Sequence, residues 1–138
     1  MNSNKLQIGD TYKTIVSYTQ KQVEEFARLS GDHNPIHLDK DYAATTVFKR
    51  PIIHGSFSMS IFSKIMGMEF PGQGSVYIDH TISFLRPMYV ETAYRVEIEI
   101  LELDAKRHTA KMRTDIFDDT TGKQTIRGIN TVMHKEKI

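Results

Sequence analysis

One segment, GSFSMSIFSKIMGM over residues 55–68, constrains the fold more than any other part of the chain. Lys64 is its only charged residue. The apolar residues fall around most of a helical circumference: Phe57, Met59, Ile61, Phe62, Ile65, Met66 and Met68. A helix that is apolar nearly all round is typical of a protein interior. The segment therefore predicts a buried helix, about 21 Å long at 1.5 Å per residue.

The residues after this helix alternate between apolar and polar side chains, as strands with one buried face do. Strands are predicted over residues 75–84, 94–103, 109–117 and 124–134, with Val76, Ile78, Ile82 and Phe84 expected on one face of the first. Asp118 to Lys123 predicts a hairpin turn. One buried helix followed by antiparallel strands predicts a single α+β domain over residues 1–138, with the sheet wrapped around the helix.

The N-terminal part carries helix signals. Residues 6–16 suggest a short strand or bent extended segment, and Thr19 then looks like an N-cap. Val23, Phe26 and Ala27 form the apolar stripe of a surface helix that Gly31 ends. Pro35 predicts a turn at DHNP. Asp39 is expected to cap a second short helix that runs to Ala44.

The composition narrows the classes of function. A net charge of +1 without a basic stripe argues against a nucleic-acid partner. There is no cysteine, hence no disulfide, thiolate metal site or cysteine nucleophile. No signal-peptide core or run of about 18 apolar residues occurs. We therefore expect a soluble cytoplasmic protein that does not bind membranes, with MHKEKI at the C-terminus as a solvated tail.

The stretch LSGDHNPIH gathers groups that could move protons. Asp32 and His37 could divide acid and base work, and a stiff Asn34-Pro35 turn would hold them at a fixed distance. From local spacing alone, an ordinary solvated turn after a helix is the stronger interpretation. A metal site is disfavoured, because His33 and His37 flank a proline and cannot share one helical face.

The start of the buried helix is the second candidate site. Backbone N–H groups in a first helical turn lack partners, and Gly55 would let a ligand approach them closely as an oxyanion hole. A narrow stripe of small residues follows along the helix: Ser56, Ser60, Ser63 and Gly67. Close packing against the sheet explains most of them, and Ser63 is the best candidate for another role.

Together these features resemble the MaoC-like dehydratases, also known as the hydratase 2 family. The resemblance rests on the pattern Ser/Thr-Gly-Asp-x-Asn-Pro-aliphatic-His with a downstream alanine, which Ser30 to His37 and Ala43 fill. It continues through PIIHG and GSVYIDHTISFLRPMYV and covers nearly the whole chain. It implies a hotdog fold, in which an antiparallel sheet wraps one long helix. It also implies a homodimer, with no metal or redox cofactor.

The resemblance also implies roles for particular residues. Asp32 and His37 would be the catalytic pair, and the Gly55 N–H would bind the thioester oxygen. Further substrate-binding or supporting roles would fall to Asn34, Ser63 and Met66. Similar enzymes often carry glutamine where this chain has His80, which leaves the packing there open. His33 occupies the variable position of the pattern and receives no role.

The activity implied is (R)-specific hydration of trans-2-enoyl-CoA. A dehydratase acting on acyl carrier protein is the nearest alternative. The basic residues Lys49, Arg50, Lys64 and Arg86 would suit either an acidic carrier or the phosphates of CoA. A hotdog thioesterase is a further alternative, although it would not need the whole GDHNPIH arrangement. A catalytically inactive, ligand-binding hotdog is the last, and the intact Asp32 and His37 count against it.

Overall fold

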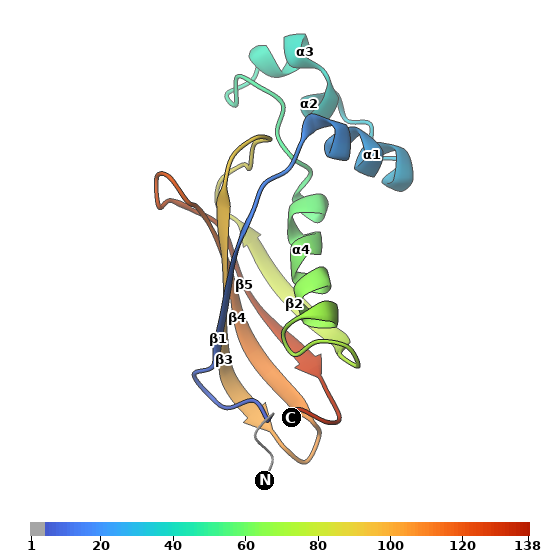
Figure 1. The fold of residues 1–138 in the computed structure, drawn as a ribbon. Coiled ribbons are helices and arrows are strands. Elements are labelled where there is room, and N and C mark those ends of the chain that lie inside the picture. Colours follow the sequence, from blue (N-terminus) through green and yellow to red (C-terminus); the bar gives the residue numbers. More distant parts are fainter. Residues whose placement is uncertain (1–4) are drawn as a thin grey trace.

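The centre of the molecule is the helix α4 (Gly55–Met68), and a five-stranded antiparallel sheet curves around it (Figure 1). The computed structural model describes residues 5–138. The strands, given in spatial order, are β1 (Thr11–Val16), β3 (Tyr94–Asp104), β4 (Thr109–Asp118), β5 (Gln124–Met133) and β2 (Val76–Phe84). The predicted α+β arrangement, with a sheet around one helix, is confirmed.

The core lies between the inner face of α4 and the concave face of the sheet. Phe62, Ile65 and Met66 of the helix are at most 1% exposed. Their fully buried neighbours on the sheet include Val96, Ile98, Ile100, Met112, Ile116, Ile126 and Val132. Each large apolar side chain buried in this way stabilises the fold by about 1.5–3 kcal/mol. The alternation in β3 is confirmed, because its apolar residues are buried while Arg95, Glu97 and Glu99 are half-exposed on the other face.

The other face of α4 departs from the prediction of a helix buried all round. Ser56, Ser60, Ser63 and Lys64 are exposed in the single chain, and Met68 is 59% exposed. One sheet can cover only one side of a helix, so nothing within residues 5–138 covers this face. Across residues 5–138, none of the helices has the length and apolar character needed to cross a membrane.

The edge strand β2 contains a bulge that the sequence pattern did not predict. Tyr77 pairs with Val132 and Asp79 with Thr131, which leaves Ile78 as an extra residue. The Asp79 side chain accepts the Thr131 N–H at 3.1 Å. Because a bulge exchanges the two faces of a strand, the expected common face is wrong. Val76 and Ile78 are exposed, whereas His80 is half-buried and its ring lies 5.2 Å from that of Phe62.

Three short helices form a cap at the N-terminal end of α4 (Figure 1): α1 (Gln20–Ser30), α2 (Pro35–Leu38) and α3 (Lys40–Ala44). The predicted boundaries of α1 are confirmed. Thr19 and Gln22 form a reciprocal capping box, which satisfies two N–H groups at the start of the helix. Gly31 ends the helix with φ of +81°, a left-handed conformation that favours glycine.

The predicted turn at Pro35 contains a helix of its own. Proline is well suited to the first helical position, where no N–H is needed, so α2 begins at Pro35. The Asn34 side chain caps it by accepting the Ile36 N–H at 3.2 Å. Asp39 caps α3, as predicted, by accepting N–H groups from Asp41 and Tyr42.

The C-terminal residues pack against the body of the protein, so the expected solvated tail is wrong. His134 and Ile138 are only 3% and 4% exposed. The His134 Nε2 lies 2.8 Å from the Gln73 carbonyl, and its Nδ1 accepts the N–H groups of Glu136 and Lys137. An imidazole with both nitrogens engaged fixes this segment, which a hydropathy pattern does not reveal.

Candidate active site

The Asp32 loop is shaped by hydrogen bonds between side chains and nearby backbone. After Gly31 turns the chain, the Asp32 Oδ1 accepts the Asn34 N–H at 3.2 Å. The Ser30 hydroxyl accepts the Asp32 N–H at the same distance. Such local bonds are typical of aspartate and asparagine in turns. They hold an exposed carboxylate directly beside the start of α2.

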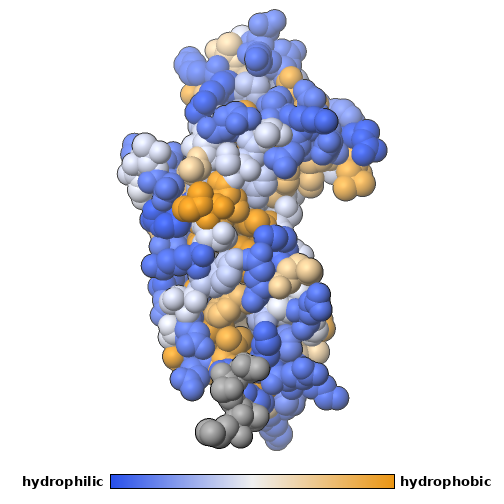
Figure 2. All heavy atoms as spheres, viewed as in Figure 1, coloured by the Kyte–Doolittle hydropathy of each residue, from blue (hydrophilic) through white to orange (hydrophobic). Residues whose placement is uncertain are grey.

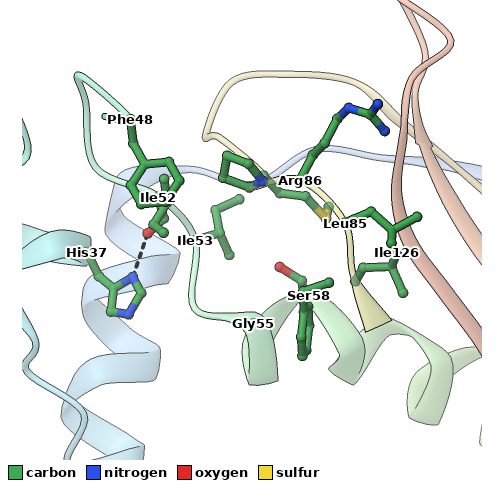
Figure 3. A pocket seen from close by; sticks show the side chains of 12 residues that line it. His37, Phe48, Ile52, Ile53, Gly55, Ser58, Leu85, Arg86 and Ile126 are labelled. Atoms are coloured by element: carbon green, nitrogen blue, oxygen red, sulfur yellow. Dashed lines mark hydrogen bonds between the residues drawn. The ribbon is translucent and has the colours of Figure 1, made fainter. Parts of the chain in front are cut away.

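His37 lies on α2 with its ring buried and its tautomer fixed. Its Nδ1 is 2.7 Å from the Ile52 carbonyl oxygen (Figure 3). A carbonyl can only accept, so Nδ1 carries the hydrogen and the neutral ring has a bare lone pair on Nε2. The Gln20 side chain donates to the His37 carbonyl at 3.0 Å and ties α2 to α1. His37 is therefore presented as a proton acceptor in a fixed orientation.

A second histidine lies against the first. His54 immediately precedes α4, is 1% exposed, and stacks on His37 with ring centroids 3.9 Å apart and planes at 29°. Its Nε2 is 3.0 Å from the Asp32 carbonyl oxygen, and its Nδ1 is buried without a partner in the described part of the chain. Burial lowers the pKa of His54, and His37 acts in the same direction, while the hydrogen bond to the Asp32 backbone and the Asp32 charge partly oppose the shift.

Asp32, His37 and His54 form one cluster, hereafter the triad cluster, and each offers one ligand-type atom within 4.8 Å of the others. Such a group could in principle hold a metal ion. The lone pairs of an imidazole lie in its ring plane, however, and stacked rings direct them alongside each other. A tetrahedral site needs ligands that converge. The cluster is therefore better arranged for proton exchange than for metal coordination.

A cavity of about 490 Å³ opens beside the triad cluster. Twelve residues line it, most of them apolar: His37, Phe48, Ile52, Ile53, Gly55, Ser58, Phe84, Leu85, Arg86, Pro87, Met88 and Ile126. In Figure 3, His37 lies at one side, Ser58 rises from α4, and Arg86 extends outward. An apolar cavity with a few polar groups is typical of a small-molecule site.

The N-terminus of α4 opens into this cavity. His54 makes no side-chain cap, so the first N–H groups of the helix lack cap partners. Gly55 lines the cavity, and a Cβ built on it would lie 3.0 Å from the Phe84 ring. The missing side chain keeps the helix end accessible. Its N–H groups and positive dipole end are suited to developing negative charge.

The structure brings together some of the residues singled out from the sequence. Asp32 and His37 belong to one cluster, and His37 and Gly55 line one cavity. Asn34 shapes the loop by capping α2. Ser63, on the exposed face of α4, and Met66, in the core, do not line the cavity formed by residues 5–138. Their substrate-binding roles stay predictions.

Sequence reasoning assigned no role to three residues that the structure places here: His54, Ser58 and Phe48. His54 stood directly before Gly55 at a helix start, which was a usable signal. Its stacking on His37 joins segments 17 residues apart and depends on the tertiary fold. Ser58 lies outside the serine stripe, is 2% exposed, and donates to the His54 carbonyl at 3.1 Å.

Comparison with known proteins agrees with this arrangement. Residues 3–136 match the family model described as MaoC like domain. The chain belongs to the MaoC-like family. It is 38% identical over 117 residues to the (R)-specific enoyl-CoA hydratase of Aeromonas caviae, covering 85% of this chain and 87% of that protein. The family resemblance expected from the sequence is thereby confirmed.

Two further proteins are similar to most of the chain. A solved (R)-hydratase from A. caviae superimposes with a TM-score of 0.89 and 36% identity, over 94% of this chain and 97% of that one. The mitochondrial 3-hydroxyacyl-[acyl-carrier-protein] dehydratase of Arabidopsis thaliana is 26% identical over 130 residues, 93% of this chain and 77% of its own length. The hotdog fold expected of a MaoC-like chain is confirmed.

Proposed function

We propose that this MaoC-like protein is an (R)-specific enoyl-CoA hydratase, which reversibly adds water to trans-2-enoyl-CoA to give (R)-3-hydroxyacyl-CoA. The observation that carries the proposal is the position of the triad cluster. The Asp32 carboxylate and the His37 ring belong to one cluster, and His37 also lines the cavity that receives the N-terminus of α4. The name and 38% identity of the Aeromonas relative support the same activity.

The proton chemistry follows from the two acceptors. An ionised carboxylate and an imidazole Nε2 lone pair can each accept a hydrogen bond from one water molecule. As the water oxygen bonds to C3, one water proton passes to the Asp32–His37 pair. The pair returns to its starting protonation state when it gives a proton to C2. Imidazole is the stronger base of the two in water. We assign proton acceptance to His37 and orientation of the water to Asp32.

The negative charge created by this addition needs stabilisation. Attack at C3 moves electrons onto the thioester oxygen, which becomes enolate-like. The Gly55 N–H at the start of α4 would donate to that oxygen, in a cavity whose apolar walls strengthen the interaction. A fixed N–H needs no reorganisation as charge develops. Neither Gly55 nor the pair requires a metal or redox cofactor for this chemistry.

The carrier of the acyl group is expected to meet the basic residues near the cavity. Arg86 lines it, and Arg50 stacks on the Tyr89 ring at 3.9 Å. Among residues 5–138, neither arginine forms an ion pair, whereas Lys64 is paired with Glu69. We propose CoA as the carrier, because the more similar Aeromonas relative is named for CoA. The Arabidopsis relative keeps acyl carrier protein as the alternative to be tested.

We propose a homodimer in which a second copy covers the bare face of α4. Three features favour this: β2 is an edge strand with exposed Val76 and Ile78, Met68 is exposed, and a hollow lies beside α1. Three apolar and three polar residues line the hollow: Phe26, Leu29, Phe57, Gln22, Glu25 and Arg28. Figure 2 shows the notch beneath the overhanging cap. Such a dimer would return Ser63 to an interior position. Light scattering of the purified protein, and of Ile78→Lys, tests it.

The activity test is direct. Purified protein is mixed with crotonyl-CoA, the enoyl absorbance is followed, and the product is oxidised by an (R)-specific 3-hydroxyacyl-CoA dehydrogenase. Loss of absorbance with (R) product supports the proposal. Release of free CoA indicates a thioesterase instead, and no change with any chain length indicates an inactive binding protein. A parallel assay with crotonyl-acyl carrier protein decides the carrier.

A further inference from the structure

We propose that His54 is a positioning residue that holds both members of the catalytic pair and remains uncharged while His37 takes the proton. The inference rests on the proposed function and adds a third residue to its machinery. His54 touches the pair in two ways: a hydrogen bond to the Asp32 backbone and a stacked contact with the His37 ring.

The hydrogen bond determines where the His54 proton lies. Its Nε2 is 3.0 Å from the Asp32 carbonyl, which only accepts, so Nε2 carries the hydrogen. Asp32 lies in an exposed loop, and this bond ties its backbone to a residue that is 1% exposed at the start of α4. The hydrogen bond therefore fixes the position of the Asp32 loop relative to the helix that presents the Gly55 N–H.

The stacked contact determines the orientation of His37. With centroids 3.9 Å apart, the His54 ring blocks rotation of the His37 ring on that face. The Ile52 carbonyl fixes the same ring through Nδ1 at 2.7 Å. Phe26 of α1 contacts His54 in turn, with centroids 4.8 Å apart. His37 is therefore held by an in-plane bond and a face contact, and its Nε2 keeps one direction.

The unpartnered Nδ1 of His54 argues for a role beyond packing. A buried acceptor without a hydrogen bond lowers stability, and an apolar ring such as phenylalanine would avoid that loss. Protonating Nδ1 would place a second positive charge against His37 as that ring becomes imidazolium. Burial of His54 opposes this protonation, so the charge formed during the reaction stays on His37 beside the Asp32 carboxylate.

Three substitutions at position 54 distinguish the contribution of the hydrogen-bond donor from those of the ring contact and of packing. His54→Gln places an amide near the original Nε2 and keeps the bond to Asp32. His54→Asn places its amide near Nδ1 and cannot reach, and His54→Phe keeps only the ring. We expect kcat for crotonyl-CoA hydration to fall about 100-fold in the Asn and Phe variants, with KM changed less than about threefold. The Gln variant should recover most of kcat.

The outcomes are distinct. Three results would overturn the proposal. They are a near-normal kcat in all three variants, an equal loss of kcat in the Gln and Asn variants, and a loss of kcat that parallels the fall in melting temperature. If the variants fail to fold, long-range ¹H–¹⁵N spectra of the wild-type protein at pH 7 decide: neutral His54 protonated on Nε2 supports it, and a charged or Nδ1-protonated ring overturns it. If the wild type does not hydrate crotonyl-CoA, the proposed function fails while these spectra still test the hydrogen bond.

Discussion

Two polar clusters, one around His80 and one around His37 and His54, differ in how many histidine ring nitrogens have hydrogen-bond partners. His80 lies on the inner face of β2, where Tyr77 bonds its Nδ1 and the Thr114 Oγ1 lies 2.6 Å from its Nε2. We call Tyr77, His80 and Thr114 the sheet cluster. In the triad cluster, by contrast, the buried His54 Nδ1 has no hydrogen-bond partner within residues 5–138, and His37 lines a cavity.

Burial affects both histidines in the same direction. It lowers the pKa of His80 to about 4 and also lowers that of His54. The histidine in the sheet cluster uses both ring nitrogens within the protein, which is the state expected of a structural residue. A histidine at a cavity can keep a ring nitrogen free to bind a substrate or a proton. A lowered pKa alone therefore does not distinguish a working histidine from a packed one, whereas the hydrogen-bond inventory does.

The largest expected difference between the clusters is in catalysis. Asp32→Asn and His37→Gln should each lower kcat for crotonyl-CoA by about 1,000-fold or more, because a positioned acid or base contributes about 10²–10⁴-fold. The folded state of the Asp32 variant should persist, since Asp32 is exposed. Glutamine at position 37 loses the Nδ1 hydrogen bond to Ile52, so the melting temperature of that variant is measured beside its kcat. His80→Gln is the matched control, with near-normal kcat expected. A comparable loss of kcat in His80→Gln would show that the two clusters do not differ in catalysis.

The space around two glycines, Gly128 and Gly55, shows how closely each cluster is packed. A Cβ at Gly128 would lie 2.8 Å from the Thr114 Oγ1, 2.9 Å from the His80 Nε2 and 2.9 Å from the Thr81 carbonyl. Gly128→Ala should therefore lower the free energy of unfolding by about 1–3 kcal/mol in urea titrations. At Gly55 the obstacle is the Phe84 ring, which is 55% exposed and can move.

Gly55→Ala should accordingly change the free energy of unfolding by less than about 0.5 kcal/mol. It should lower kcat/KM about tenfold, because a methyl group obstructs access to the N–H groups that hold the oxyanion. Equal destabilisation by the two alanines would show that the cavity end of α4 is as closely packed as the sheet.

A smaller effect is expected from a single atom of the sheet cluster. Thr114→Val removes the hydroxyl from a fully buried site and leaves the His80 Nε2 without its partner. Leaving a buried polar group without its partner costs about 1–3 kcal/mol, which is measured as a lower melting temperature. Thr114→Ser keeps the hydroxyl and serves as the control. Unchanged stability in the valine variant would show that water satisfies His80.

The smallest expected effect is a pH dependence of stability. The folded state keeps His80 neutral down to about pH 4, whereas an unfolded histidine binds a proton near pH 6.5. Stability should therefore fall as the pH decreases from about 6.5 to about 4. His80→Gln should reduce this loss of unfolding free energy between about pH 6.5 and about pH 4 by an amount on the order of 1 kcal/mol, since the ring is only half-buried.

Much of the fold could be predicted because its signals are local. The apolar helix of residues 55–68, the Thr19 and Gly31 ends of α1, and the alternation of β3 all follow from short-range patterns. The bulge in β2 and the burial of His134 and Ile138 could not be predicted, because they depend on pairing across the sheet and on contacts far along the chain.

The candidate site shows the same division. The composition of LSGDHNPIH and the family pattern pointed to Asp32 and His37. Neither reveals the role of His54, since stacking against His37 is set by where α2 meets the start of α4. The exposure of Ser63 likewise depends on which face of α4 the sheet covers. A cytoplasmic location and a one-domain extent over residues 1–138 stay predictions from the sequence.

The extra residue in β2 has a consequence for how this strand can change over evolution. Ile78 is the bulged position, so losing its codon would straighten the edge and still leave His80, Ile82 and Phe84 facing α4. Losing a codon later in the strand would reverse the residues that follow and move Phe84 away from the cavity. A deletion within the bulge therefore keeps the inner face of β2, whereas a deletion later in the strand does not.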